Sequence, residues 1–170
     1  MRNALHLIVL AAVMILSSGC KSTLRVESKR HLQQFQGGAR PVYVTNPELS
    51  REYEILRASK IYPLASEPEN ARKLTLRPMR QYGRCANPLM LCGLTLGVVP
   101  GVITAPYVFD YTLETDGVPE QRAHRLPLYE RFSVWEWLVP RDDHATFAEA
   151  LAWSKPDERW ASAPTANLRP

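Results

Sequence analysis

The chain has 170 residues, of which 22% are charged and 45% are hydrophobic, and its formal net charge is only +4. This charge is too small for a nucleic-acid-binding surface, so we expect no nucleic acid among its partners. The length suits one domain of ordinary size with a single hydrophobic core.

The N-terminus has the pattern of a secretory signal peptide. Arg2 precedes an apolar run from Ala4 to Leu16 that only His6 interrupts, and the small residues "SSGC" follow. The run is short for a transmembrane helix, so a simple N-terminal anchor helix is the less favoured interpretation. We therefore predict a lipoprotein-type signal peptide over residues 1–19.

The segment "LSSGC" resembles the lipobox of bacterial lipoproteins, although Ser17 stands where that motif most often has Leu. The resemblance implies cleavage before Cys20 and a diacylglyceryl group on its sulfur, usually with an acyl chain on the amine. Two or three acyl chains anchor a protein stably in a bilayer. In the family's enterobacterial sorting rule, Asp after the lipidated cysteine retains the protein in the inner membrane. Lys21 therefore implies the outer membrane, with the protein facing the periplasm.

The cysteine count is consistent with this assignment. If Cys20 carries lipid, Cys85 and Cys92 remain as a pair in an oxidising compartment. We predict a disulfide between them, and two buried thiols are the alternative. Residues 20–40 are mostly polar and end in two glycines, so we interpret them as a tether between the lipid and the folded part.

The first patterned segment is "PVYVTNPELSREYEILRASKIYPL". It predicts a strand over residues 42–45, a helix that is capped by Asn46 and ends near Ser59, and a second strand over residues 60–64. A strand, helix, strand order of this length favours a right-handed parallel crossover. One face of the helix should carry Leu49, Tyr53 and Leu56.

Three more strands are predicted from short runs of apolar, β-branched and aromatic residues. Their sequences are "RKLTLRPM", "YVFDYTLE" and "RFSVWEWLV". The turn signal Asp116-Gly117 should lie in a loop longer than two residues, because Pro119 cannot donate a hydrogen bond to a ladder. The last strand is apolar on both faces, which favours a covered position. Trp135 and Trp137 should then pack in the core, and a hydrophobic groove is the alternative.

A final helix is predicted from Asp142-Asp143, whose negative charge suits a helix N-terminus, to about Trp153. Phe147 and Leu151 should face the core. Residues 155–170 are rich in Pro and Ala and should form a flexible tail.

These elements predict a single α+β domain over residues 41–154, with a small mixed β-sheet, one crossover helix and a C-terminal helix. "TLGVVP" precedes an aromatic strand and a Trp-containing strand, and this order is similar to that of small lipoproteins of Gram-negative bacteria over roughly residues 40–140. The N-terminal half also looks like the small α/β modules of envelope-assembly lipoproteins. Neither resemblance assigns an activity.

Residues 85–109, "CANPLMLCGLTLGVVPGVITAPYVF", contain no charged side chain. Their apolar part, residues 89–104, would reach about 24 Å as a helix, against a hydrocarbon core of about 30 Å. Its glycines and Pro100 also disfavour a helix. We predict that "NPLML" is the tip of a disulfide-linked loop and "GLTLGVV" a buried strand or extended crossing. The alternative is a membrane-dipping loop that presents Leu89, Met90 and Leu91.

A search for catalytic motifs finds no nucleophile elbow, no zinc-binding helix motif and no phosphate-binding loop. The one local cluster that suggests catalysis is "RDDHATF", in which Asp142 or Asp143 would orient His144 as a general base. An acidic helix start beside an exposed histidine is the favoured interpretation. A zinc site would need the unsuitably spaced residues Cys85, Cys92 and His124. We therefore expect no enzymatic activity, metal or cofactor.

Basic side chains recur in the middle of the chain, at Arg72, Lys73, Arg77, Arg80 and Arg84. They are candidates for contact with lipid phosphates or cell-wall acids, and a solvated strand edge is the alternative interpretation.

The candidate interaction surface combines the arginines of this series with the apolar loop tip: Arg77, Arg80, Arg84, Leu89, Met90 and Leu91. We hypothesise a lipid-anchored, non-catalytic envelope protein that binds or supports another envelope protein of unknown identity. The rival hypotheses are a periplasmic hydrolase that uses His144 and a membrane-surface or lipid-binding protein that uses residues 89–104.

Overall fold

The structure is a computed structural model that describes residues 21–28, 32–82, 90–140 and 142–157. It confirms the predicted α+β class. The predicted signal peptide, Cys20 and residues 158–170 lie outside the described residues.

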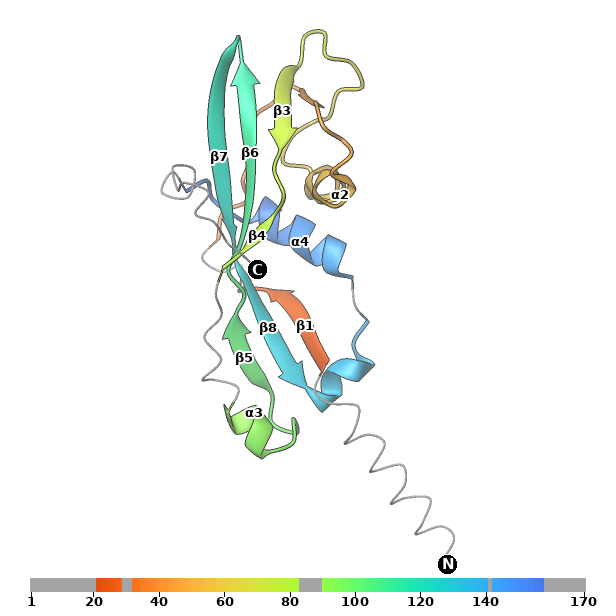
Figure 1. The fold of residues 1–170 in the computed structure, drawn as a ribbon, viewed down its shortest axis with the longest axis vertical. Helices are drawn as coiled ribbons and strands as arrows, with labels where there is room; N and C mark the ends of the chain where they lie inside the picture. The colour runs from red at the N-terminus through yellow and green to blue at the C-terminus, as the bar shows by residue number, and fades with distance from the viewer. Residues whose placement is uncertain (1–20, 29–31, 83–89, 141, 158–170) are drawn as a thin grey trace, which may run out of the picture.

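The strands form two sheets, so the prediction of one sheet is wrong (Figure 1). The five-stranded sheet contains β2 (Val42–Val44), β3 (Arg72–Leu76), β4 (Arg80–Gln81), β6 (Tyr107–Thr115) and β7 (Val118–Leu126). The three-stranded sheet contains β1 (Lys21–Val26), β8 (Leu128–Ser133) and β5 (Gly101–Thr104), in that order. Pro106 lies between β5 and β6, and Pro127 lies between β7 and β8. Proline cannot donate to a ladder, so both connections end one sheet before the next begins.

The predicted crossover helix is α2 (Ser50–Ser59), and it joins two parallel strands. The second parallel strand is β3, whereas residues 60–64 were predicted. Lys60 adopts a left-handed conformation that ends the helix, and only Leu64 forms an isolated bridge to β2. Asn46 does not cap the helix, because its side-chain amide exchanges two hydrogen bonds with the backbone of Leu76, at 2.9 and 2.8 Å.

The predicted C-terminal helix is confirmed as α4 (Asp143–Ala152). The Asp142 carboxylate caps it by accepting the N–H of Ala145 at 2.9 Å. Helices α2 and α4 lie beside each other (Figure 1). Phe147 and Leu151 of α4 join the core that both helices form with the five-stranded sheet.

The predicted strand "YVFDYTLE" is confirmed as β6, with Phe109, Tyr111 and Leu113 fully buried. The prediction of a long loop after it is wrong. Thr115 pairs with Val118, so the hairpin turn has two residues, and both have positive φ. Glu114 pairs with Pro119. Hydrogen-bonded and non-hydrogen-bonded pairs alternate in antiparallel ladders, so the missing N–H falls at a pair that needs no donor.

Both ends of the domain extend further than predicted. Residues 21–26 form strand β1 where a tether was expected, because Leu24 and Val26 pack against the core. Phe35 also packs there and donates its N–H to the Ala152 carbonyl at 2.7 Å. Beyond α4, residues 155–157 continue along β7, where the Asp157 N–H donates to the Ala123 carbonyl at 2.9 Å.

Two predicted strands contain helical turns instead. The segment "GLTLGVV" begins in α3 (Met90–Leu94) and continues in turns before β5. The strand predicted from "RFSVWEWLV" ends at Ser133, and η3 (Val134–Leu138), a 3-10 helix, follows. No helix within the described ranges is long and apolar enough to cross a membrane.

Candidate functional site

Exposed large hydrophobic side chains are concentrated at one end of the molecule. Among the described residues there are ten, and nine of them lie in η3 or in the segment from the start of α3 to the end of β5. Figure 1 shows α3 and the helical turn after β8 at the end opposite the β6–β7 hairpin turn. We call this surface the apolar end and define it by nine residues: Met90, Leu94, Leu96, Val98, Val99, Val102, Trp135, Trp137 and Leu138.

One buried carboxylate holds η3 in place. Glu136 is only 1% exposed, although its neighbours Trp135 and Trp137 are 51% and 54% exposed. Its carboxylate accepts a hydrogen bond from the Thr23 hydroxyl and forms an ion pair with Arg131, whose Nε lies 3.0 Å away. The sheet brings these two partners together, because Thr23 and Arg131 are paired across β1 and β8. The short turn therefore carries its two indole rings at fixed positions on the surface.

The ionisation of Glu136 follows from the same contacts. Burial acts to raise the pKa of this carboxyl, but the Thr23 hydroxyl and the guanidinium of Arg25, 3.3 Å away, outweigh it. The positive charge of Arg131 acts in the same direction. The pKa of Glu136 is therefore held below its usual range, and the residue is ionised at neutral pH.

The loop between α3 and β5 is bonded directly to η3. The Val134 N–H donates to the Gly97 carbonyl at 3.1 Å, and the Trp135 indole N–H donates to the Val98 carbonyl at 3.0 Å. Leu96 has a φ of 51°, in the left-handed region that is costly for a branched side chain, and its side chain remains 63% exposed. The two segments of the apolar end therefore form one connected surface.

The N-terminal strand starts at this surface. Lys21 is the first residue of β1 and pairs with Ser133, the last residue of β8 before η3. Its ammonium nitrogen lies 5.4 Å from the centroid of the Trp137 ring, within the range of a cation–π contact. Cys20 lies outside the described residues, but it directly precedes Lys21, and consecutive Cα atoms are about 3.8 Å apart. The residue that follows the predicted site of lipid attachment, Lys21, thus lies next to the apolar end.

The predicted interaction surface is not one surface among its described members. Arg80 donates to the Asp110 carboxylate at 2.7 Å and lies in the five-stranded sheet, whereas Met90 is 72% exposed in α3 at the end of the molecule (Figure 1). Burial raises the pKa of Asp110, and Arg80 and then Arg77 partly offset this effect. Arg84, Leu89 and the side chain of Leu91 are not described.

Two other members of the basic series also have partners. Arg72 donates to the Arg40 carbonyl at 2.8 Å and lies over the ring of Tyr62. Lys73 lies 3.9 Å from the Glu114 carboxylate. The side chains of Arg72, Lys73 and Arg80 therefore make contacts within the protein and are not simply free basic groups on its surface.

The structure leaves the disulfide prediction open, because Cys85 is not described. Cys92 is 3% exposed, and its sulfur lies 3.4 Å from the Phe132 carbonyl oxygen. Cys92 is thus buried between its own helix, α3, and strand β8, beneath the apolar end.

His124 lies in the core, and both of its ring nitrogens have partners. Nδ1 lies 2.8 Å from the Ser154 hydroxyl, and Nε2 lies 3.2 Å from the Tyr111 hydroxyl. The Ser154 hydroxyl donates to the Leu151 carbonyl at 2.7 Å, so it must accept from the N–H at Nδ1. The pair is therefore connected in the opposite sense to a nucleophile and its base, in which the serine donates to the histidine.

The other side of the ring continues the same chain of donors. Tyr111 donates to His124 Nε2 and accepts from Tyr62 at 2.9 Å, and Tyr62 accepts from Arg122 at 3.1 Å. Burial and then the charge of Arg122 lower the pKa of His124 to about 4. The histidine is neutral at neutral pH, and neither nitrogen is left for a metal. No group of three or more metal-binding side chains occurs in the described part of the chain.

The predicted catalytic cluster forms a helix start. Asp142 uses its carboxylate to cap α4, and His144 is exposed in the first helical turn. This is the interpretation that the sequence favoured for "RDDHATF".

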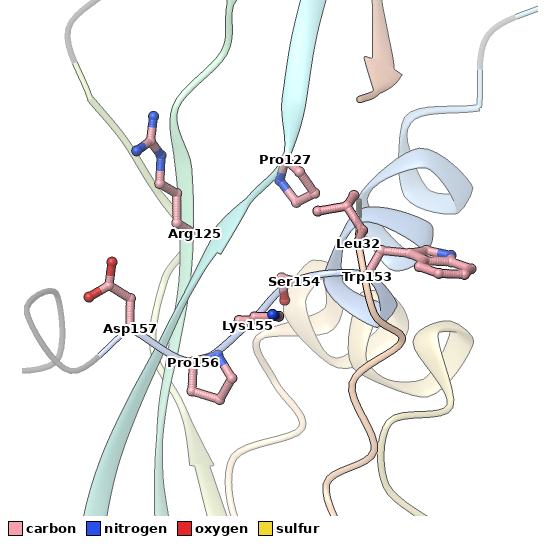
Figure 2. A pocket seen from close by; sticks show the side chains of 8 residues that line it. All are labelled: Leu32, Arg125, Pro127, Trp153, Ser154, Lys155, Pro156 and Asp157. Atoms are coloured by element: carbon pink, nitrogen blue, oxygen red, sulfur yellow. The ribbon is translucent and has the colours of Figure 1, made fainter. Parts of the chain in front are cut away.

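A surface hollow of about 610 Å³ lies where the end of α4 meets β7. Figure 2 shows Arg125 and Asp157 on one side of it and Leu32, Pro127 and Trp153 on the other. The only hydroxyl among its lining side chains is that of Ser154. This residue is 1% exposed, and its hydroxyl is hydrogen-bonded to His124 and to the Leu151 carbonyl. The hollow therefore presents no available hydroxyl nucleophile.

No protein-family model, curated protein or solved structure matches this chain. Two features of the structure were missed by the sequence interpretation. They are the buried contacts of Glu136 with Thr23, Arg25 and Arg131, and the buried series of hydrogen bonds through His124. The signal for the first was a lone Glu between two tryptophans, in a segment interpreted as a strand with apolar faces. The second had no local signal, because its members come from four separate segments.

Proposed function

We propose that the protein is a lipid-anchored, non-catalytic lipoprotein of the bacterial cell envelope. In this proposal Cys20 carries the lipid, the protein faces the periplasm from the outer membrane, and it binds or supports another envelope protein. The observation that carries the proposal is the position of Lys21, which is paired with Ser133 in the sheet and lies over the Trp137 ring. A lipid on the preceding residue would hold the fold directly against the membrane, at the end where apolar side chains are exposed.

The polar groups support a non-catalytic role. His124 is buried and donates to Ser154, and the Asp142 carboxylate is used to cap α4. A hydrolase based on His144 would need an acidic partner and a nucleophile beside it. Substitution of His144 by Ala should therefore leave the phenotype of cells that depend on this protein unchanged.

Lipidation is tested by metabolic labelling with a palmitate analogue. Cys20→Ser should abolish labelling and leave the uncleaved precursor. Cys85→Ser is the matched control and should be labelled like the wild type. Persistent labelling of the Cys20→Ser protein would refute the lipid anchor.

Location is tested by density-gradient fractionation of membranes. The wild type should fractionate with porins, and Lys21→Asp should move part of the protein to the inner membrane in an enterobacterial host. Lys21 also contacts Trp137, so Lys21→Ser is the matched control that removes this contact without introducing the retention signal. Wild-type protein found only in inner-membrane fractions would refute outer-membrane residence.

Because the proposed anchor would hold the apolar end at the membrane, we expect the envelope partner at the opposite end of the molecule. The β6–β7 hairpin turn points away from the apolar end, and Val118 beside it is 68% exposed (Figure 1). A photo-cross-linking residue at position 118 should capture an envelope protein in wild-type cells, and the adduct should disappear in Cys20→Ser cells. No adduct from position 118 would contradict a partner at the hairpin.

A further inference from the structure

The apolar end is unusual because the fold displays these side chains instead of covering them. Leu138, Leu94 and Met90 are 80%, 73% and 72% exposed. Large contiguous apolar patches on soluble monomers mark interaction sites for proteins, ligands or membranes.

The display is built into the structure from both of its segments. Glu136 is bound by Thr23, Arg25 and Arg131, so η3 cannot turn to bury its tryptophans without breaking these contacts. Trp135 is bonded to the neighbouring loop through its indole N–H, while the ring itself remains half exposed. The surface therefore exists before any partner arrives, which lowers the cost of ordering it on binding.

The position of Lys21 identifies the occupant. Trp137 lies under the ammonium group of Lys21, one residue after the proposed lipid attachment site. Acyl chains on Cys20 would bring the bilayer to this side of the fold, so the surface that first meets the apolar end is the phospholipid leaflet itself. Tryptophan is enriched at membrane interfaces, where its ring is buried and its N–H remains bonded.

We propose that the apolar end inserts into the headgroup and acyl boundary of the phospholipid leaflet that holds the anchor. Trp135, Trp137 and Leu138 contact lipid from η3, and the exposed side chains from Met90 to Val102 contact lipid from the neighbouring segment. The lipid anchor and this surface then fix the orientation of the domain, with the β6–β7 hairpin pointing away from the membrane. The inference rests on the proposed anchor at Cys20 and adds a second membrane contact.

The test measures contact between tryptophan and lipid in the whole lipidated protein. Protein purified from membranes is reconstituted into vesicles of phosphatidylethanolamine and phosphatidylglycerol, with and without bromine on the acyl chains. The emission of the wild type should fall by roughly half in brominated vesicles, because two of its four tryptophans would lie at the interface. The double variant Trp135→Phe, Trp137→Phe should lose this quenching. Trp153→Phe, which replaces a ring packed against the core, is the matched control and should keep it.

A second variant guards against misfolding of the double variant. Leu138 is 80% exposed, so Leu138→Asp should fold normally but place a charge at the lipid boundary. It should reduce the quenching by about twofold, because charged groups are strongly disfavoured in the acyl region.

The outcomes separate this inference from the anchor itself. Vesicle-bound wild type without bromine quenching would overturn the docking proposal and leave the anchor intact, whereas absent palmitate labelling would refute the anchor. Cross-linking of a photo-reactive residue at position 137 to a second copy or another protein, with no lipid adduct, would also overturn docking to the bilayer.

Discussion

The buried histidine should make the stability of the fold depend on pH. The pKa of His124 is about 4 in the folded protein and 6.5 in a solvated chain. Because the folded value is the lower one, the unfolded chain binds the proton more readily below pH 6.5, so unfolding becomes more favourable as the pH falls. At about 1.4 kcal/mol per pH unit, this pKa difference lowers the free energy of unfolding by about 3 kcal/mol in total as the pH falls. About 2 kcal/mol of this stability is lost by pH 5.

Protonation of His124 would also disturb its hydrogen bonds. A proton on Nε2 would make this nitrogen a donor, so the Tyr111 hydroxyl would have to accept there and turn its own proton toward Tyr62. Tyr62 already accepts from Arg122, so its hydroxyl proton would lose its present acceptor. A buried donor without a partner costs about 1–3 kcal/mol, which agrees in size with the pKa shift.

The assay is urea unfolding at several pH values between 7 and 4.5, for the wild type and for His124→Gln, which cannot titrate. Other groups also titrate in this range, but they are shared, so the difference between the two pH profiles isolates His124. His144→Gln is the matched control, because His144 is exposed, and its profile should run parallel to that of the wild type. Parallel profiles for the wild type and His124→Gln would refute the reasoning.

Three further predictions concern single contacts. Glu136→Gln should lower the free energy of unfolding by about 1–3 kcal/mol at pH 7, measured with urea, because the arginines around it lose their counter-charge. The pKa of Glu136 is lowered in the fold, so this difference should be present at neutral pH and shrink as the pH falls below 4.5; an equal loss at pH 3 would contradict it. Arg80→Met should cost about 2 kcal/mol in the same assay, because it leaves the Asp110 carboxylate without its partner, and it should cost less in an Asp110→Asn background. Alkylation of denatured, unreduced protein from cells should modify neither Cys85 nor Cys92, because a disulfide is predicted between them, and quantitative labelling of both would show free thiols.

The sequence predicted those elements whose local pattern agrees with their final surroundings. The alternation in β3 is strong because Leu74 faces the core while its neighbours Lys73 and Thr75 are exposed. In β6 the apolar side chains of the alternation, such as Tyr111, join the same core. The start of helix α4 was predicted because Asp142 forms the cap that its residue type favours. In these segments local preference and tertiary packing require the same structure.

The predictions failed where distant residues decide the local conformation. Asn46 has the chemistry of a helix cap, yet β3 offers its amide two backbone partners, and the helix starts later without a side-chain cap. Residues 21–26 have too few apolar side chains to predict a strand, and β8 supplies the ladder that orders them. Neither partner can be identified from sequence spacing, because both lie far along the chain.

The errors around α3 and η3 have a different physical origin. We interpreted "GLTLGVV" and "VWEWLV" as strands on the assumption that apolar residues are buried, and the assumption fails there. Leu96 is both exposed and held at positive φ, so this segment departs from two local preferences at once. Departures of this kind are expected where function, and not folding stability, selects the sequence. A leaflet that covers the apolar end would restore the burial that the pattern implies, with lipid in place of a protein core. The patterns would then be informative about the membrane-bound protein, although they misled us about its strands.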